Sequence, residues 1–294
     1  MSLRIGTRGS ALALIQTENV VGMLADRGIE AEIVTIRTAG DATTNVPLHA
    51  IGGQGVFVRA LDDAILRGEI DAAVHSMKDI PAARPAGLVC PAVLARDSPA
   101  DFLAYDRPRD AIRVIGSSST RRRAQILRDD PTLEVKQLRG NVDTRIRKLR
   151  EGQYDAIVLA EAGLERLGLQ LPGEPLPIDR FVPSPNQGTV AVVCRDDPDI
   201  IGPLAALDHA STRLDVTIER AVMEEVGGGC FTPQGIYCQG GDLIAEVLAL
   251  DGSRWERIEQ HVTTIEEART CGQALREKAE GLIQEARATL GIEP

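Results

Sequence analysis

The stretch 74–81 (VHSMKDIP) brings four chemically different side chains within five residues. It carries an imidazole at His75, a hydroxyl at Ser76, an ammonium at Lys78 and a carboxylate at Asp79. A short apolar run precedes it and a proline ends regular structure just after it, which is typical of a strand end that presents polar groups to a cleft. The same residues could equally form a loop whose Lys78 and Asp79 are solvated surface charges.

Arginine is concentrated in one segment of an acidic protein. The net charge is −10, but residues 113–150 hold nine arginines and two lysines against four acidic residues. Residues 206–294, by contrast, hold sixteen acidic residues against eight arginines and lysines. Because guanidinium groups pair with carboxylates or phosphates in bidentate geometry, the segment predicts a small polyanionic ligand. The overall negative charge argues against nucleic-acid binding.

Two junctions between a predicted strand and a predicted helix lie in this segment, and both could hold an anion. The first carries three consecutive hydroxyls and three consecutive guanidinium groups: Ser117, Ser118, Ser119, Arg121, Arg122 and Arg123. The second is 138–141 (LRGN), with Arg145 further along, and residues 8–10 (RGS) occupy the matching place near the N-terminus. Backbone N–H groups at a helix start favour anions. The plain alternative is that serine caps the helix while the arginines stay solvated.

The spacing of apolar residues predicts an α/β protein with a mainly parallel sheet, followed by a small antiparallel α+β unit. Strands are expected at 3–7, 31–38, 112–115, 133–138, 155–160, 189–194, 236–239, 243–250 and 257–262. Helices are expected at 12–24, 57–65, 120–127, 141–150, 211–226 and 266–289. Residues 93–108 are a candidate domain crossing, and the strand at 189–194 should return to the first sheet. The long polar segment 39–54 is typical of a lid or a disordered loop.

Cysteine and histidine usage points away from metal and disulfide chemistry. The five cysteines are scattered, no pair has a CxxC spacing, and the four histidines do not cluster with them, so we expect no metal site. Cys230 follows three glycines, which let the backbone turn sharply or approach a ligand. From spacing alone it could equally be a small buried thiol. No apolar run is long enough to span a bilayer, so we expect a cytoplasmic protein without membrane contact.

Six motifs, in order along nearly the whole chain, resemble the porphobilinogen deaminase (hydroxymethylbilane synthase) family. They are 7–13 (TRGSALA), 74–81 (VHSMKDIP), 116–122 (GSSSTRR), 138–145 (LRGNVDTR), 162–168 (AGLERLG) and 228–230 (GGC). The resemblance implies two domains built like type II periplasmic binding proteins and a third, α+β domain. The boundaries we expect are 1–95 plus 188–205 for domain 1, 96–187 for domain 2 and 206–294 for domain 3.

The resemblance also implies an activity, a cofactor and the residues that serve them. Porphobilinogen would be the substrate, four units would be joined head to tail, and hydroxymethylbilane and ammonia would be released. A dipyrromethane cofactor would be attached by a thioether to Cys230, and Asp79 would be the catalytic carboxylate. The implied cofactor-binding residues are Lys78, Asp79, Ser117, Ser118, Ser119, Arg121, Arg122, Arg139 and Gly140. The implied substrate-binding residues are Arg8, Ser10, Gln16, Arg139, Arg145, Arg166, Gln187 and Gly188. The family also suggests a monomer.

At two places the sequence departs from the family pattern, and both could change how the protein binds the growing pyrrole chain. The usual Gly-Gly-Lys-Gly is 52–55 (GGQG) here, and the usual Gly-Gln-Gly-Ala is 186–189 (NQGT). His75 is expected to be structural, because the implied chemistry needs a carboxylate beside pyrrole nitrogens. The composition and the alternation of predicted strands and helices would also fit a non-catalytic, two-lobed binding protein for a polycarboxylate or oxyanion. Such a protein would have no role for Cys230.

Overall fold

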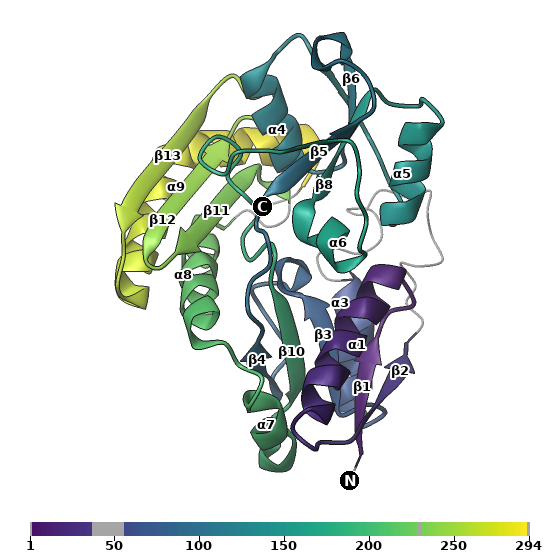
Figure 1. Cartoon of the computed structure of the whole chain (residues 1–294). Coiled ribbons are helices and arrows are strands. Elements are labelled where there is room, and N and C mark those ends of the chain that lie inside the picture. The colour runs from purple at the N-terminus through teal and green to yellow at the C-terminus, as the bar shows by residue number, and fades with distance from the viewer. Residues whose placement is uncertain (1, 37–55, 228–230, 293–294) are drawn as a thin grey trace. The chain divides into compact units, whose positions relative to one another are not determined.

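The computed structural model describes residues 2–36, 56–227 and 231–292, apart from the side chains of residues 56 and 57. Contacts divide the chain into two compact units (Figure 1). Unit 1 comprises Met1–Asp97, Arg166–Gly168 and Gly188–Arg213, and unit 2 comprises Ser98–Glu165, Leu169–Gln187 and Leu214–Pro294. The division into three domains stays a prediction.

Unit 1 is built on a five-stranded sheet with the order β2-β1-β3-β10-β4. Its strands are β1 (Leu3–Thr7), β2 (Ala31–Thr35), β3 (Ala72–Ser76), β4 (Leu88–Val93) and β10 (Val190–Arg195). β1 pairs in parallel with β2 and β3, whereas β10 pairs antiparallel with β3 and β4. The predicted return of the strand at 189–194 to the first sheet is therefore confirmed.

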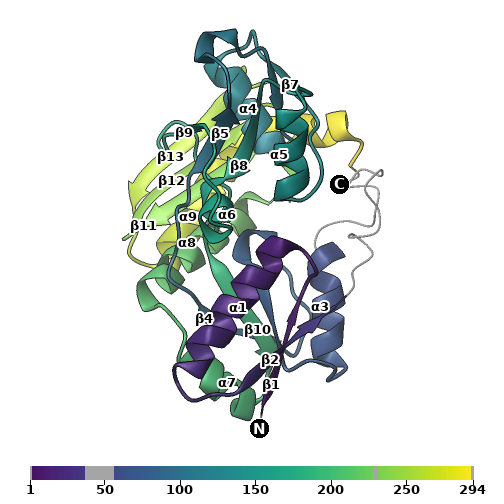
Figure 2. The ribbon, with the colours of Figure 1, turned by 45° about the vertical axis from the view of Figure 1, so that its right-hand side comes forward.

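Helices cover both faces of this sheet because successive strand residues point to opposite sides. The helices are α1 (Ala11–Ala25), α3 (Val56–Leu66) and α7 (Pro198–Ala205). Ile5 shares one core cluster with Val20 of α1 and Leu204 of α7. Gly6, the next residue, faces α3: a Cβ there would lie 3.3 Å from a methyl group of Leu61. Figure 2 shows α1 and α3 flanking β1 and β2.

Unit 2 contains a second five-stranded sheet, with the order β7-β6-β8-β5-β9. Its strands are β5 (Asp101–Tyr105), β6 (Val114–Gly116), β7 (Glu134–Lys136), β8 (Ala156–Ala160) and β9 (Gly173–Pro175). β6 is parallel to β7 and β8, and β5 is antiparallel to β8 and β9. Helices α4 (Thr120–Asp129) and α5 (Val142–Arg150) join separate core clusters, through Ile126 and Ile146, so they lie on opposite faces.

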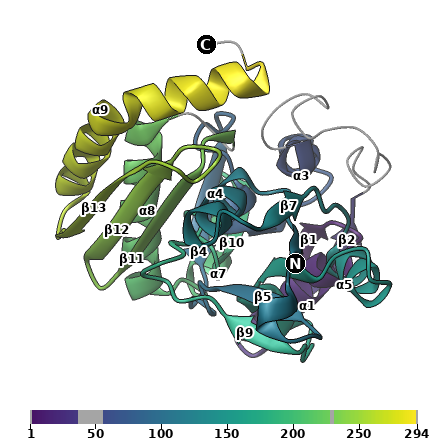
Figure 3. The ribbon, with the colours of Figure 1, turned by 90° about the horizontal axis from the view of Figure 1, so that it is seen from above.

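The C-terminal part of unit 2 contains a small antiparallel sheet, as predicted, and two helices pack on one face of it (Figure 3). Its elements are α8 (Ala210–Val226), whose first four residues belong to unit 1, β11 (Gln234–Gln239), β12 (Asp242–Leu248), β13 (Trp255–His261) and α9 (Ile265–Leu290). One core cluster joins side chains of α8, α9 and the three strands. α9 begins with a capping box between Thr264 and Glu267, and it ends at Gly291 with a left-handed residue, φ 65°.

Several sequence predictions need correction. Both large sheets are mixed, so the prediction of a mainly parallel sheet is wrong. β4, β5, β9, α7 and the short helix α6 (Glu161–Arg166) were not predicted. β5 lies inside the segment 93–108 that we expected to be a crossing, because the charge at its first residue, Asp101, is buried by tertiary partners. The predicted lid at 39–54 lies outside the described residues. Within the described residues, no helix is long and apolar enough to span a membrane.

Candidate active site

The stretch around Asp79 forms a short turn at the end of a buried strand. β3 ends at Ser76, and a single 3-10 turn covers Met77–Asp79. The backbone N–H of Met77 donates to the carbonyl of Thr189 (2.9 Å), and its buried side chain anchors the turn. Asp79 is exposed at the end of the turn. The turn is thus held by the buried side chain of Met77, while the carboxylate of Asp79 remains accessible to a ligand.

A cavity of about 80 Å³ in unit 1 gathers four of the residues predicted to serve the site. Asp79, Arg8, Ser10 and Gln16 all line it, together with Ser76 and His75 among others. They meet because β1 and β3 are parallel neighbours, so their carboxyl ends open on the same edge of the sheet. Gln16 reaches this edge from α1 and donates through Nε2 to the Ser76 hydroxyl at 3.0 Å.

His75 is held in the uncharged form at the wall of this cavity. Burial, and then the positive charges of Arg84 and Arg8, lower its pKa to about 3. The ring is buried, and Nε2 has no hydrogen-bond partner among the described residues. An imidazole with this pKa remains neutral throughout the physiological range and cannot act as a general base that titrates near pH 7.

In unit 2, the three predicted serines are each used by the protein itself. Ser119 caps α4 by accepting from the backbone N–H of Arg122 at 3.4 Å. Ser118 donates its hydroxyl to the carbonyl of Leu138 (2.6 Å) and accepts from the N–H of the same residue (3.1 Å). Ser117 accepts from the N–H of Ser119. The Ser118 bonds bring the two predicted anion-binding junctions together, at the ends of β6 and β7.

Arg121 and Arg122 lie in a buried ion-pair cluster rather than on an open surface. Both side chains reach Asp101, with N–O distances of 2.7 Å, and Asp101 is 1% exposed. Burial alone would raise the pKa of Asp101, but the two guanidinium groups outweigh it and hold this pKa far below its usual range. Sequence reasoning missed Asp101, because it lies 20 residues before Arg121 and no local pattern marks it.

The second junction depends on a glycine with unusual backbone geometry. Gly140 has a φ of 116°, and a Cβ there would lie 2.6 Å from Cγ2 of Thr144. The carbonyl of Gly140 accepts a hydrogen bond from Nε of Arg145 (2.8 Å), and the carbonyl of Arg139 accepts from Nζ of Lys148 (3.1 Å). This glycine therefore sets the backbone that carries Arg139 and helps to hold Arg145.

Three further predicted residues contact the segments by which the chain passes between its units. In unit 1, Arg166 donates to the Asp97 carboxylate (2.7 Å) and to the carbonyl of Gly188 (2.6 Å). In unit 2, Gln187 donates through Nε2 to the carbonyl of Pro99 and to the Asp101 carboxylate, both at 2.8 Å. Arg166, Gln187 and Gly188 are thus part of the chain crossings, and ligand binding by them stays a prediction.

Two predicted features cannot be placed. Cys230 lies outside the described residues, as does Gln54. In the described part of the chain, no cluster of histidine, cysteine and acidic side chains could hold a metal ion.

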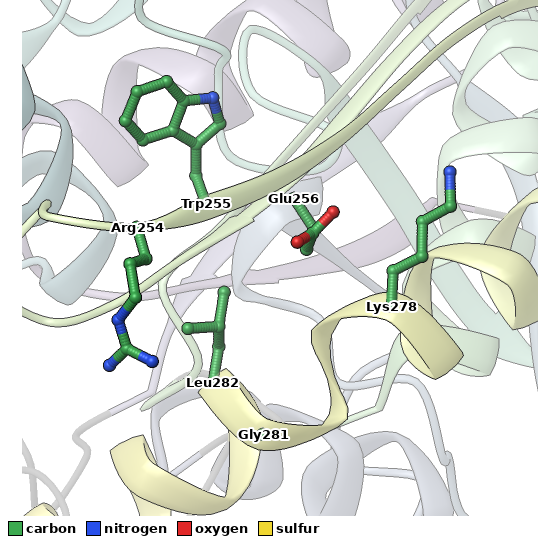
Figure 4. A pocket seen from close by; sticks show the side chains of 6 residues that line it. All are labelled: Arg254, Trp255, Glu256, Lys278, Gly281 and Leu282. Atoms are coloured by element: carbon green, nitrogen blue, oxygen red, sulfur yellow. The ribbon is translucent and has the colours of Figure 1, made fainter.

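A larger hollow in unit 2, about 410 Å³, is lined by residues of β13 and α9, Trp255 and Lys278 among them (Figure 4). Figure 4 shows its side chains spread apart rather than aimed at a common centre. It contains none of the predicted residues. We therefore take the small cavity at Asp79, and not this larger hollow, as the candidate active site.

The fold and the site define a class: an α/β protein with a carboxylate and predicted anion-binding residues at the ends of its strands. Two family models then match the chain, "Porphobilinogen deaminase, dipyromethane cofactor binding domain" over residues 3–201 and "Porphobilinogen deaminase, C-terminal domain" over residues 213–281. The chain belongs to the porphobilinogen deaminase family. It is accordingly a transferase of the hydroxymethylbilane synthase type, with a dipyrromethane-binding domain and a small pyrrole as substrate.

Relatives from archaea and bacteria agree with this assignment. A probable porphobilinogen deaminase of Methanosarcina acetivorans is 52% identical, covering 98% of each chain. A probable porphobilinogen deaminase of Archaeoglobus fulgidus is 43% identical, covering 96% of this chain and all of its own. A porphobilinogen deaminase of Acidithiobacillus ferrooxidans is 46% identical over 79% of each chain. The resemblance, the enzyme class and the predicted tetrapyrrole chemistry are confirmed, and the non-catalytic binding protein is set aside.

Solved structures with a similar fold are much more distant. A periplasmic substrate-binding protein from Coxiella burnetii shares 16% identity at a TM-score of 0.42, covering 74% of this chain and 96% of its own. The methionine-binding protein MetQ shares 14% identity at a TM-score of 0.43, covering 70% of this chain and 89% of its own. Similarity at this level carries no functional argument. The α/β class itself is confirmed by the two mixed sheets and the C-terminal sheet described above.

Proposed function

We propose that the chain deaminates four porphobilinogen molecules and joins them head to tail onto a dipyrromethane held by a thioether at Cys230. Hydroxymethylbilane and ammonia are released, and the dipyrromethane stays on the protein. We further propose that the protein acts as a cytoplasmic monomer without membrane or nucleic-acid contact. Family membership supports the reaction, and the observation that supports its location is the cavity in which Asp79 meets Arg8, Ser10 and Gln16.

Asp79 is proposed as the catalytic carboxylate. When the aminomethyl C–N bond of porphobilinogen breaks and ammonia leaves, positive charge develops on the pyrrole ring and its methylene carbon. A carboxylate beside the ring stabilises that charge until the α-carbon of the neighbouring pyrrole attacks the methylene carbon and forms the new C–C bond. It can then receive the proton that this attacking α-carbon loses. Asp79 is suited to this role because the turn that carries it is anchored by Met77, while its own side chain remains exposed at the cavity.

Arg8 and Ser10 are proposed to hold the carboxylates of the substrate. Porphobilinogen carries an acetate and a propionate group, which need charge-assisted hydrogen bonds. Both side chains line the cavity beside Asp79, and Ser10 is fixed in place as the N-cap of α1, where it accepts from the N–H of Ala13 at 3.4 Å. The start of a helix adds a favourable potential for an anion.

The residues of unit 2 fit a ligand with several carboxylates. Arg121, Arg122 and Asp101 together carry a net positive charge, and Nε of Arg121 is buried without a hydrogen-bond partner among the described residues. Dipyrromethane, when bound, supplies the pyrrole α-carbon to which the first substrate unit is joined. Arg121, Arg122, Arg139 and the neighbouring serines, Ser117, Ser118 and Ser119, are proposed to hold its acetate and propionate groups.

The other cysteines are poor candidates for the covalent attachment, which supports Cys230. A thioether forms from a reactive thiolate, and burial disfavours the thiolate. Burial raises the pKa of Cys194 to about 12 and also raises the pKa of Cys271. Cys238 is fully buried, and the half-buried Cys90 donates its thiol to the carbonyl of Ala92 at 3.5 Å.

Intact-mass spectrometry of the purified protein tests the attachment. We expect the mass of the polypeptide plus two pyrrole units, and a colour reaction with Ehrlich's reagent. Cys230→Ser should lack the added mass, while Cys271→Ser, a matched change at a buried thiol, should keep it. Porphobilinogen turnover is followed as uroporphyrin after acid oxidation. A bare polypeptide mass together with no product refutes the proposed function.

A further inference from the structure

One buried carboxylate binds three side chains that are proposed to serve the ligand site. Asp101, the first residue of β5, accepts from Nη1 of Arg121 at Oδ2 (2.7 Å). Its Oδ1 accepts from Nη2 (2.7 Å) and Nε (3.1 Å) of Arg122. The same oxygen accepts from Nε2 of Gln187 (2.8 Å). Asp101 thus occupies both of its oxygens with groups from α4 and from the segment that leads back to unit 1.

These bonds fix the direction in which both guanidinium groups point. Nη1 of Arg121 has three acceptors. Besides the Asp101 carboxylate, it donates to Oε1 of Gln125 (2.9 Å) and to the carbonyl of Val182 (3.0 Å). Arg122 donates its remaining Nη1 to the carbonyl of Val158 (3.1 Å). Neither arginine can turn away without leaving the Asp101 carboxylate buried and short of donors, which is costly.

The charges of this cluster do not cancel. Two guanidinium groups face one carboxylate, so the cluster of Asp101, Arg121 and Arg122 carries a net charge of +1. Arg121 is 4% exposed, and its Nε is buried with no hydrogen-bond partner within the described ranges. A buried donor without an acceptor on a buried cation is unfavourable, and a carboxylate close to the cluster would offset its excess positive charge.

We propose that Asp101 is a positioning residue for carboxylate recognition, which aligns Arg121 and Arg122 and leaves the pair with a net positive charge toward a ligand carboxylate. The inference rests on the proposed function, in which that carboxylate belongs to the dipyrromethane. Removing the Asp101 charge frees both guanidinium groups and misaligns the pair.

The test compares Asp101→Asn and Asp101→Glu with Asp155→Asn in the full-length protein. Asp155 is a suitable control because it belongs to the same unit and accepts from the backbone N–H groups of Arg113 and Val114, without contacting Arg121 or Arg122. For each variant, intact mass gives the fraction of folded protein that carries the dipyrromethane, and urea unfolding gives the stability.

In Asp101→Asn, we expect this fraction to fall at least about tenfold below that of Asp155→Asn, because one partner of a buried charge pair is lost. Asp101→Glu, which keeps the charge, should recover part of it. Equal fractions in Asp101→Asn and Asp155→Asn, with only the stability reduced, overturn the proposal.

If Asp101→Asn does not fold, the cofactor fraction and the KM of Asp101→Glu test the proposal instead. A cofactor fraction below that of Asp155→Asn, or a raised KM for porphobilinogen, supports the positioning role. An unchanged fraction and an unchanged KM overturn it. A parent protein without the added mass of two pyrroles refutes the proposed function before any variant is compared, so the two failures are distinguishable.

Discussion

Gly140→Ala should destabilise the second predicted anion-binding junction, residues 138–141, more than an ordinary glycine substitution does. The φ of 116° at Gly140 is one that residues with a Cβ rarely adopt, and forcing alanine into it costs about 1–3 kcal/mol. The new Cβ would also lie 2.6 Å from Cγ2 and 2.8 Å from Cβ of Thr144. Overpacking of this kind adds about 1–3 kcal/mol. The free energy of unfolding should therefore fall by about 2–6 kcal/mol.

The control for this prediction is Gly152→Ala. Gly152 also has a positive φ, 73°, but a Cβ there would have no atom within 4 Å, so only the backbone cost of about 1–2 kcal/mol applies. The double variant Gly140→Ala with Thr144→Ser removes the closest methyl group and should recover about 1 kcal/mol. Urea unfolding followed by circular dichroism measures all three.

The functional consequence follows from the bond between Gly140 and Arg145. Because the Gly140 carbonyl accepts from Nε of Arg145 at 2.8 Å, a shifted backbone also moves this guanidinium group. We expect the KM for porphobilinogen to rise in Gly140→Ala and to stay close to the parent value in Gly152→Ala. The reasoning is refuted if Gly140→Ala costs no more stability than Gly152→Ala, or if Thr144→Ser gives no recovery.

Substitutions at two other positions, Asp62 and Asn186, give further tests. Burial raises the pKa of Asp62 to about 6, although Arg84 lies 2.7 Å away and opposes the shift. Since the folded state holds this proton more tightly than the unfolded state, the parent should lose stability relative to Asp62→Asn as the pH rises from about 4 to about 6. Urea unfolding of both proteins between about pH 4 and about pH 6 measures this difference in the free energy of unfolding. A difference that does not change with pH contradicts the prediction. Asn186 has a φ of 63° where the family pattern has glycine, so Asn186→Ala should be less stable than Asn186→Gly by about 1–2 kcal/mol. Equal thermal unfolding midpoints for these two variants contradict that expectation.

Local patterns predicted much of the secondary structure, because apolar periodicity and end signals act over a few residues. The helix at 211–226 was predicted to within one residue, and the helix predicted at 12–24 extends one residue further at each end. The strand β5 was not predicted, because its burial depends on residues that are distant in the chain and not on a local pattern. Its first residue, Asp101, reads as a turn or surface position by residue type, and it becomes a buried strand residue only through partners far along the chain.

The same distinction applies to the candidate site. Motif order and residue type pointed to Asp79, and the structure places it in one cavity with Arg8, Ser10 and Gln16. The serines after β6 were expected to form an anion cradle, and each also bonds within the protein. Their role toward a ligand stays a prediction.

The sequence by itself determined the family and the chemistry it implies, and it predicted Asp79 as the catalytic carboxylate, because motifs depend on residue types at short spacings. Only the tertiary structure decided that His75 remains uncharged and that Arg121 and Arg122 share the buried Asp101. Both depend on burial and on charges from distant segments. The strength of an electrostatic interaction is set by depth and by distance in space, and neither can be read from separation along the chain.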